Sequence, residues 1–264
     1  MRAGDGRVKL LFVGDVFGQP GRAALLEWLP RFRETAAIDF VIANGENAAN
    51  GAGITSKIAR KLLDGGVDVL TTGNHVWRQR EVFAFLSADE RIVRPANYPP
   101  EAPGRGLTVR PAADGTPVAV VNLAGSLFMD TGLSPFRVVD RLVDEAHEQA
   151  AIVIVDLHAE ATSEKVAMGH YLDGRVTAVV GTHTHVQTSD ARVLPGGTAY
   201  ITDVGMTGPL ESVIGVRTEI ILQRFATEMP QRFEVGEGPV RLNAVVIAAS
   251  GGTATAVETL DLVV

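Results

Sequence analysis

The chain repeats one pattern as far as about residue 185: a short apolar run rich in β-branched residues, a polar or glycine-bearing loop, and a segment with helical periodicity. The apolar runs are 9–14, 39–44, 67–72, 116–125, 151–160 and 176–185. The helical patterns cover 23–34, 56–66, 80–87, 136–150 and 162–174. Because continuous apolar strands need cover on both faces, this alternation predicts buried, mostly parallel strands flanked by helices.

The pattern changes in two places. Residues 94–106 carry four prolines and predict a loop. From about residue 190, short β-like runs take over at 191–197, 198–205, 240–250 and 253–264. The glycine pair Gly251–Gly252 between the last two runs predicts a hairpin. We find no internal repeat or linker, and therefore expect residues 1–264 to form a single α/β domain with a β-rich C-terminal third.

Composition excludes several classes of protein. A chain with 46% hydrophobic and 21% charged residues can bury a substantial core, which excludes a disordered protein. The absence of cysteine excludes disulfides, thiolate metal sites and a cysteine nucleophile. Thirty-one acidic residues against 24 basic ones give a net charge of −7, so the chain has no general attraction to nucleic acids or anionic membranes.

The beginning of the chain predicts a strand. Residues 1–15 contain a short apolar run without a small-residue cleavage motif, which argues against a signal peptide. No apolar stretch approaches the roughly 20 residues that span a bilayer. We therefore expect a cytoplasmic protein with no membrane partner and no stable nucleic-acid partner, and a homo-oligomer stays an open alternative.

Polar side chains follow the apolar runs where each run ends. They are Asp15; Glu46 and Asn47; Asn74 and His75; Asn122; His158; and His183 and His185. Because the carboxyl ends of parallel strands share one edge of a sheet, we expect these side chains to lie on one rim.

Each of these residues also has an ordinary structural explanation. Asp15 could cap the next helix, Asn47 could form a turn in its glycine-rich loop, and His75 could be a hydrogen-bonded surface histidine. Such explanations must hold separately at six strand ends, whereas one metal site explains all of them. His147 and His170 lie in helical segments away from strand ends, so we leave them outside the site.

The ligand types narrow the choice of metal ion. Imidazole, carboxylate and amide oxygen without sulfur suit Fe, Mn, Zn or Co better than copper or a structural zinc site. One Asp, one Glu, two Asn and three or four His are too many ligands for one ion. We therefore expect two ions that share a bridging carboxylate, an arrangement typical of phosphoester hydrolysis.

Five short blocks of sequence carry the predicted ligands: GDVF (14–17), NGEN (44–47), GNHVW (73–77), DLHAE (156–160) and GTHTH (181–185). In this order they resemble the DxH, GDxxD, GNHE, H and GHxH blocks of the calcineurin-like metallophosphoesterase superfamily. Phe17 stands where a histidine ligand is usual, and Glu46 takes the place of the bridging aspartate. With NGENAANGAGIT (44–55) and ITDVGMTGP (201–209), these replacements resemble the YmdB-like branch.

The resemblance implies a fold and a set of ligands. The fold is a four-layer αββα sandwich of the α/β (α+β) class, in which helices flank two mixed β-sheets. The implied ligands are Asp15, Glu46, Asn47 and His185 for one metal, and Glu46, Asn74, His158 and His183 for the other. Fe or Mn is favoured over Zn or Co. His75 is not a ligand in this scheme and would protonate the leaving alkoxide, a role that suits an imidazole.

The implied activity is that of a dinuclear phosphodiesterase acting on cyclic nucleotides such as 2′,3′-cyclic AMP. A hydroxide that bridges the metals would attack phosphorus, with His75 as general acid. A phosphomonoesterase of the same superfamily, either a nucleotidase or a protein phosphatase, stays an alternative because the metal core is shared. No basic residue stands inside the five blocks to bind a doubly charged monoester, which favours diesters.

Two further interpretations come from other classes of protein. A non-hydrolytic protein that binds a metal or a nucleotide stays an alternative. An amidohydrolase barrel is excluded by the order of the motifs, because its HxH motif follows the first strand.

Overall fold

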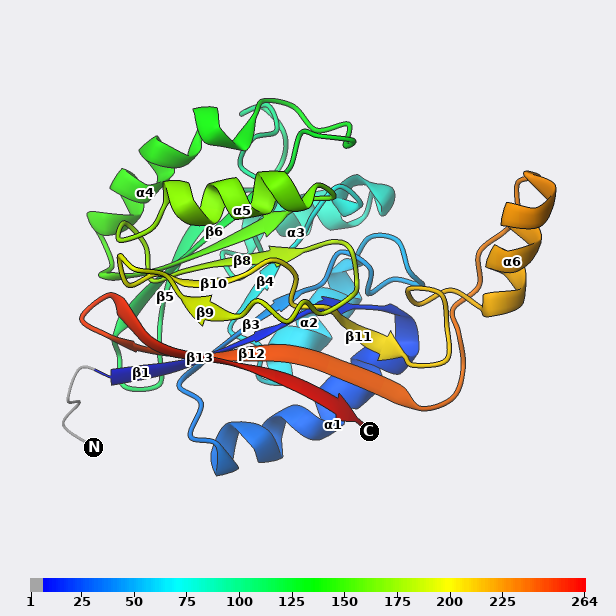
Figure 1. The fold of residues 1–264 in the computed structure, drawn as a ribbon, viewed down its shortest axis with the longest axis horizontal. Coiled ribbons are helices and arrows are strands. Elements are labelled where there is room, and N and C mark those ends of the chain that lie inside the picture. Colours follow the sequence, from blue (N-terminus) through cyan, green and yellow to red (C-terminus); the bar gives the residue numbers. More distant parts are fainter. Residues whose placement is uncertain (1–6) are drawn as a thin grey trace.

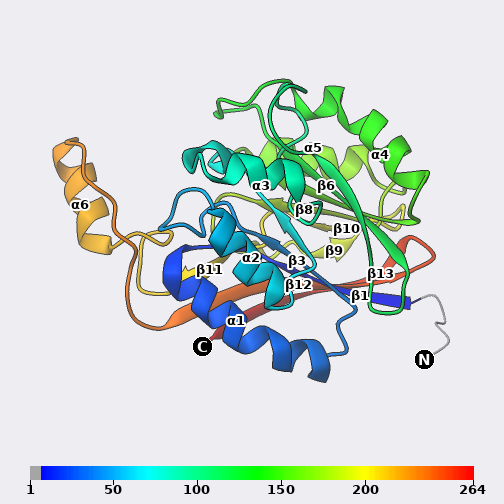
Figure 2. The ribbon, with the colours of Figure 1, turned by 180° about the vertical axis from the view of Figure 1, so that it is seen from behind.

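The computed structural model describes residues 7–264 and shows four layers (Figure 1). Residues 1–6, part of the segment for which we expected no signal peptide, lie outside the described residues. Two mixed sheets pack face to face, and helices cover the outer face of each sheet (Figures 1 and 2). The predicted αββα sandwich is therefore confirmed.

The first sheet has seven strands in the order β2-β11-β12-β1-β3-β4, with β13 paired to β12. Their bounds are β1 Arg7–Val13, β2 Asp15–Val16, β3 Phe40–Asn44, β4 Val69–Thr71, β11 Met206–Pro209, β12 Val240–Ser250 and β13 Thr253–Val263. Because β1, β3 and β4 run parallel, their carboxyl ends lie at one edge. The predicted hairpin is confirmed, since Ser250 pairs with Thr253 across the two glycines.

The second sheet has six strands in the order β5-β6-β7-β8-β10-β9. Their bounds are β5 Leu107–Pro111, β6 Pro117–Ala124, β7 Ile152–His158, β8 Ala178–Thr182, β9 Arg192–Val193 and β10 Ala199–Ile201. Strands β6, β7, β8 and β10 run parallel, and the antiparallel strands β5 and β9 form the two edges. Strand β5 was not predicted, because it is short, adjoins the proline-rich loop and ends in a proline.

Helices cover the two outer faces. Helices α1 (Gly18–Thr35), α2 (Ser56–Asp64) and α3 (Val82–Ala88) lie on the first sheet, and α4 (Val139–His147) and α5 (Thr162–Tyr171) lie on the second. Short 3-10 turns occupy Val76–Arg78 and Pro135–Arg137. A central apolar layer, which includes Phe12, Phe40 and Ile154, fills the space between the sheets. Among the described helices, none combines the length and the apolarity that crossing a membrane requires.

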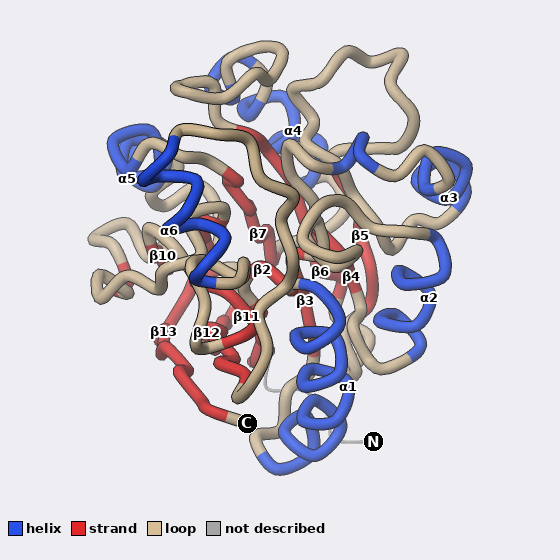
Figure 3. Tube along the Cα trace, turned by 90° about the vertical axis from the view of Figure 1, so that its right-hand side faces the viewer, coloured by secondary structure: helices blue, strands red, loops and turns tan. Residues whose placement is uncertain are grey.

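Helix α6 (Thr218–Thr227) was missed by the sequence analysis, which expected a β-rich C-terminal third. It stands away from the sandwich in Figures 1 and 2, and in Figure 3, which looks onto that side of the molecule, it lies in front of the sandwich. Ile221 is its one buried residue, whereas Leu222 and Phe225 are 60% and 75% exposed. The helix is joined to the sandwich through the segments on either side of it.

Candidate metal centre

The structure brings all seven predicted ligands and His75 together at the edge where the parallel strands of both sheets end. Asp15 begins β2, Glu46 and Asn47 follow β3, Asn74 and His75 follow β4, His158 ends β7, and His183 and His185 follow β8. The rim expected from the strand ends is therefore present. The role of each residue as a ligand stays a prediction.

Glu46 lies at the middle of the cluster and is completely buried. Its Oε1 lies 3.0 Å from His158 Nε2 and 3.2 Å from Asn47 Nδ2, while Oε2 accepts a 3.0 Å hydrogen bond from the backbone N–H of His75. Gly73 packs so closely that a side chain there would collide with the Glu46 carboxylate and the His158 ring. Burial alone would raise the pKa of Glu46, but the adjacent His158 and His75 hold it well below its usual range.

One group of donors gathers around His158. Its Nε2 lies 3.0 Å from His183 Nδ1 and 3.2 Å from Asn74 Oδ1. Glu46, His158 and His183 each offer one ligand atom, and these three atoms lie within 4.8 Å of one another. Burial, reinforced by the positive charge of His158, lowers the pKa of His183 to about 3. His183 is therefore a neutral imidazole with a lone pair available to a metal.

A second group gathers around the terminal amide of Asn47. The amide nitrogen lies 3.0 Å from His185 Nε2 and 3.4 Å from Asp15 Oδ1, and His185 Nε2 lies 3.6 Å from Asp15 Oδ1. The amide oxygen lies 2.8 Å from His75 Nδ1. A half-turn of the amide would present its oxygen to Asp15 and His185 and its nitrogen to His75. With its oxygen turned this way Asn47 can bind a metal, and the Glu46 carboxylate, 3.3 Å from His75 Nδ1, remains to accept that N–H.

Each of the three imidazoles in these groups has one nitrogen in the cluster and the other bonded outside it. The outer nitrogen of His158 contacts Thr182 Oγ1 at 2.9 Å. That of His183 contacts Glu160 Oε2 at 3.1 Å, and that of His185 contacts the Ile214 carbonyl oxygen at 2.9 Å. Partners of this kind orient metal-binding histidines and fix the nitrogen that faces the ion. These partners were missed by the sequence analysis, although Glu160 lies inside the DLHAE block.

The loop that carries His183 and His185 has an unusual backbone, with φ of 102° and 65° at these two residues. Non-glycine residues with positive φ persist only where their surroundings hold them. Asp203 holds this loop, accepting bonds from the backbone N–H of Thr184 at 3.0 Å and from its hydroxyl at 2.7 Å. Lys165 forms a buried 2.7 Å ion pair with Asp203. Asp203 follows β10 and could have been found by the strand-end rule.

The electrostatics of the cluster favour a cation. Burial would lower the pKa of His158, but the carboxylates of Glu46 and Asp15 outweigh it and raise the pKa to about 9. A site that stabilises a positive charge on a buried imidazole suits a divalent cation in place of the proton. Carboxylate, imidazole and amide donors fit such an ion. The residues present therefore fit a divalent metal.

The residues left outside the site have other roles. Asn122 Oδ1 accepts a 3.1 Å bond from the backbone N–H of Thr72 and so joins two strand ends. His147 contacts the carbonyl oxygen of Arg175 at 2.8 Å, and His170 is exposed on α5. Phe17, at the position of a usual ligand, packs its ring edge-on against His185 with 5.6 Å between centroids. Phe17 therefore supports His185 by packing.

A cavity of about 470 Å³ adjoins the cluster. Its lining includes His75, His183 and His185 as well as apolar residues such as Phe17 and Phe233. Its described lining residues include Glu160 and Glu234 but no Lys or Arg. The cavity therefore gives a small molecule access to the predicted metal ligands without adding positive charge.

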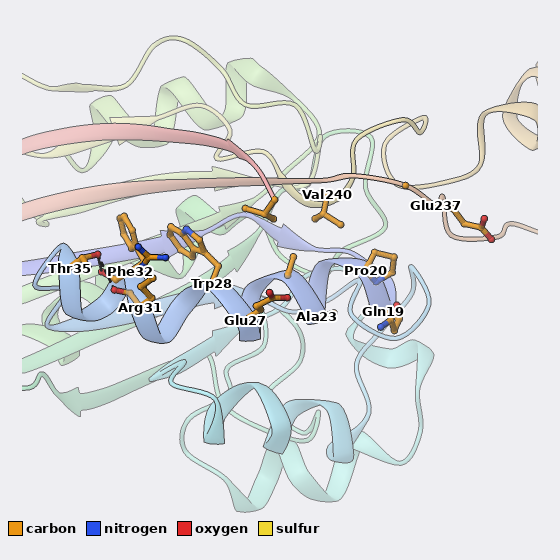
Figure 4. A pocket seen from close by; sticks show the side chains of 13 residues that line it. Gln19, Pro20, Ala23, Glu27, Trp28, Arg31, Phe32, Thr35, Glu237 and Val240 are labelled. Atoms are coloured by element: carbon orange, nitrogen blue, oxygen red, sulfur yellow. Dashed lines mark hydrogen bonds between the residues drawn. The ribbon is translucent and has the colours of Figure 1, made fainter.

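A larger groove, of about 860 Å³, lies along α1 and the start of β12 (Figure 4). Trp28 and Phe32 stack at 4.1 Å between ring centroids on its α1 side, and Val240 lies on the other side (Figure 4). Its described lining contains no histidine and none of the predicted ligands. We therefore place the functional site at the smaller cavity.

Comparison with known proteins gives consistent results. The model of the family described as YmdB-like protein matches residues 11–260. A Bacillus subtilis (strain 168) protein named 2′,3′-cyclic-nucleotide 2′-phosphodiesterase is 48% identical over 251 residues, which cover 95% of each chain.

Two solved structures share the whole fold. One is a hypothetical protein from Thermus thermophilus, with a TM-score of 0.91, 46% identity and coverage of 97% of this chain and 99% of that one. The other is described as a novel phosphatase from Mycoplasma pneumoniae, with a TM-score of 0.90, 35% identity and coverage of 97% and 94%.

Proposed function

The chain belongs to the YmdB-like protein family, and on this basis we propose that it is a divalent-metal-dependent phosphodiesterase that hydrolyses a small cyclic nucleotide such as 2′,3′-cyclic AMP. One observation carries the proposal. His158 and His185 each direct one nitrogen at a buried carboxylate, that of Glu46 and of Asp15 respectively, and His183 directs one at His158 Nε2, while a separate partner holds the other nitrogen of each ring. Such an arrangement is what a metal-dependent hydrolase requires.

We assign the donors to two ions, with Fe or Mn as the metals. Asp15, Glu46, Asn47 and His185 would hold one ion, and Glu46, Asn74, His158 and His183 the other. Glu46 belongs to both groups because it contacts members of each. When bound, such a metal pair supplies a water of lowered pKa and neutralises charge on the phosphoryl oxygens.

His75 supplies the proton in this proposal. Its side chain is 28% exposed and lines the cavity, and the Glu46 carboxylate, 3.3 Å away, accepts its Nδ1–H. Because Nδ1 is occupied, Nε2 is the atom that transfers a proton to the leaving ribose oxygen.

The charge of the cavity supports a diester over a monoester. A phosphomonoester carries two negative charges near neutral pH and is usually bound by Arg or Lys, whereas a diester carries one. The described lining of the cavity offers two carboxylates and no basic side chain. A singly charged diester is therefore the better substrate for this site.

Parallel assays test this proposal. Protein stripped with a chelator and reloaded with Mn²⁺ is assayed on 2′,3′-cyclic AMP, bis(4-nitrophenyl) phosphate and 4-nitrophenyl phosphate. We expect turnover of both diesters only in the reloaded sample, at a higher kcat/KM than for the monoester. Efficient hydrolysis of the monoester without diester turnover would replace this proposal by the phosphomonoesterase alternative. Binding of 2′,3′-cyclic AMP without turnover would favour the regulatory alternative.

We include a homo-oligomer in the proposal. The exposed apolar side chains Leu222 on α6 and Met229 in the segment after it support it, since each is 60% exposed. Light scattering on the wild type and on Leu222→Glu tests this part. We expect more than one chain per particle in the wild type and fewer in the variant; a monomeric wild type would contradict it.

A further inference from the structure

Part of the cavity lining comes from one segment, which we call the neck of α6 (residues 213–217 and 233–236). The two halves of the neck are paired by the bridge from Val216 to Val235, and a second bridge, from Val213 to Val216, lies within the first half. The backbone N–H of Arg217 also donates to the Glu234 carbonyl at 3.0 Å. No residue of α6 is among the described lining of the cavity, and Figure 1 shows α6 projecting away from the sandwich. The neck, and not the helix, is therefore the part that shapes the site.

The neck is fixed to a predicted metal ligand. The carbonyl oxygen of Ile214 accepts a 2.9 Å hydrogen bond from His185 Nδ1, and Ile214 has φ of 47°, which is unfavourable for a β-branched residue. This conformation leaves the Ile214 side chain lining the cavity and 50% exposed. The apolar wall therefore lies at a set position relative to His185.

Phe233 gives this wall an aromatic surface. It lines the cavity and is 46% exposed, although its neighbours Val216 and Phe17 are buried. The guanidinium of Arg224 lies 4.9 Å from the centroid of its ring. A half-exposed aromatic ring beside a polar reaction centre is a surface on which a flat group can stack.

The chemistry of the cavity limits the kinds of ligand that it can bind. Its lining combines the histidines that would meet a phosphodiester with an apolar and aromatic group, Ile214, Phe233 and Val235. The carboxylates of Glu160 and Glu234 disfavour a second phosphate. A volume of about 470 Å³ lies in the range of sites for small molecules.

We propose that Ile214, Phe233 and Val235 form a nucleobase subsite, which binds the base of a nucleotide whose phosphodiester lies at the candidate metal centre. This inference rests on the proposed function. In it, Phe233 stacks on the base, and the neck sets the distance from the base to the phosphodiester. The subsite makes Phe233 a determinant of specificity for nucleotides over phosphodiesters that lack a base.

The test compares 2′,3′-cyclic AMP with glycerol 1,2-cyclic phosphate, a five-membered cyclic diester without a base. Phe233→Ala should raise KM for the nucleotide about tenfold, because a base–aromatic stack is lost. It should leave kcat/KM for the glycerol diester unchanged. Phe233→Tyr keeps an aromatic ring and should retain the KM of the wild type.

Phe225→Ala is the matched control, since Phe225 is an exposed phenylalanine on α6, next to the neck, that does not line the cavity. This variant should leave KM and kcat/KM unchanged for both substrates. An equal effect of Phe233→Ala on both substrates, no effect on either, or the same effect from Phe225→Ala would each overturn the subsite.

Titration with 3′-AMP separates this inference from the proposed function. If no sample hydrolyses either diester but Phe233→Ala weakens 3′-AMP binding and Phe225→Ala does not, the subsite stands and the phosphodiesterase proposal fails. If both diesters are hydrolysed with equal kcat/KM by the wild type, the phosphodiesterase stands and the subsite is wrong.

Discussion

The groove along α1 and the cavity beside the histidines differ in a way that identifies the site. The groove has almost twice the volume of the cavity, about 860 against 470 Å³. Its polar residues, such as Glu27 and Arg31, project from a helix surface and are exposed. The cluster beside the smaller cavity contains the completely buried Asp15, Glu46 and His158, and its imidazoles are held by partners. Convergent, held polar groups therefore mark function better than volume does.

The difference arises from topology. The groove lies between one helix and the start of β12 (Figure 4), so its lining comes from neighbours along α1 and from one sheet edge. The cavity lies where parallel strands of both sheets end, and it receives side chains from segments far apart in the sequence. Only the second arrangement can concentrate several ligand types at one point.

Replacing one buried carboxylate and one exposed carboxylate by the matching amide tests the comparison most strongly. Glu46→Gln should lower both metal content and kcat/KM on 2′,3′-cyclic AMP by more than about 100-fold, because even changes to partners of metal ligands cost about 10–100-fold. Glu27→Gln in the groove should change neither. Metal analysis and steady-state kinetics on both variants give the answer; a fully active Glu46→Gln protein would place the site elsewhere.

His75→Ala separates proton transfer from metal binding. It should retain the metal content of the wild type and lose about 100- to 10,000-fold in kcat on 2′,3′-cyclic AMP, whose leaving group is an alkoxide. The loss on bis(4-nitrophenyl) phosphate should be much smaller, because a nitrophenolate leaves without a proton. Equal losses on both substrates would remove His75 from the role of general acid.

The Lys165–Asp203 pair tests whether the histidine loop must be held in place. Lys165→Met leaves the Asp203 charge buried without a partner, and should cost about 3–5 kcal/mol in the free energy of unfolding. Metal affinity should fall about 10–100-fold.

Adding Asp203→Asn to this variant removes the uncompensated charge and should recover part of the stability. Calorimetry and metal titration measure both quantities. Unchanged metal affinity in a folded Lys165→Met protein would show that the loop needs no such support.

The smallest effect is expected in the groove. Trp28→Ala removes a partly buried ring stacked on Phe32 and should cost about 1–2 kcal/mol in stability. It should leave kcat/KM unchanged within about twofold. Thermal unfolding and the diester assay measure the two effects, and a large loss of activity would give the groove a role in the reaction.

The strand-end rule explains why much of the site could be predicted from sequence. Asp15, Glu46 and His158 follow or end apolar runs, and parallel strands bring such positions to one edge. The partners of the histidines could not be predicted, because the bond from His185 to the Ile214 carbonyl depends on the positive φ of Ile214. Asp203 obeys the rule but was not recognised among the short runs of the C-terminal third.

Helix α6 escaped prediction for a different reason. Its apolar residues Ile220, Ile221, Leu222 and Phe225 spread over more than one face of a short helix, so they do not form the single stripe of a helix that packs on a sheet. The helix buries little against the sandwich, and local pattern therefore carried little information about it. The paired neck that supports it involves long-range contacts that no local pattern encodes.

The most direct test of the account is the metal content of protein purified without oxygen, measured on the same sample as its turnover of 2′,3′-cyclic AMP. The account predicts two divalent ions per chain, Fe or Mn, with turnover that disappears on chelation and returns on reloading. Turnover by protein that holds one ion or none would contradict it.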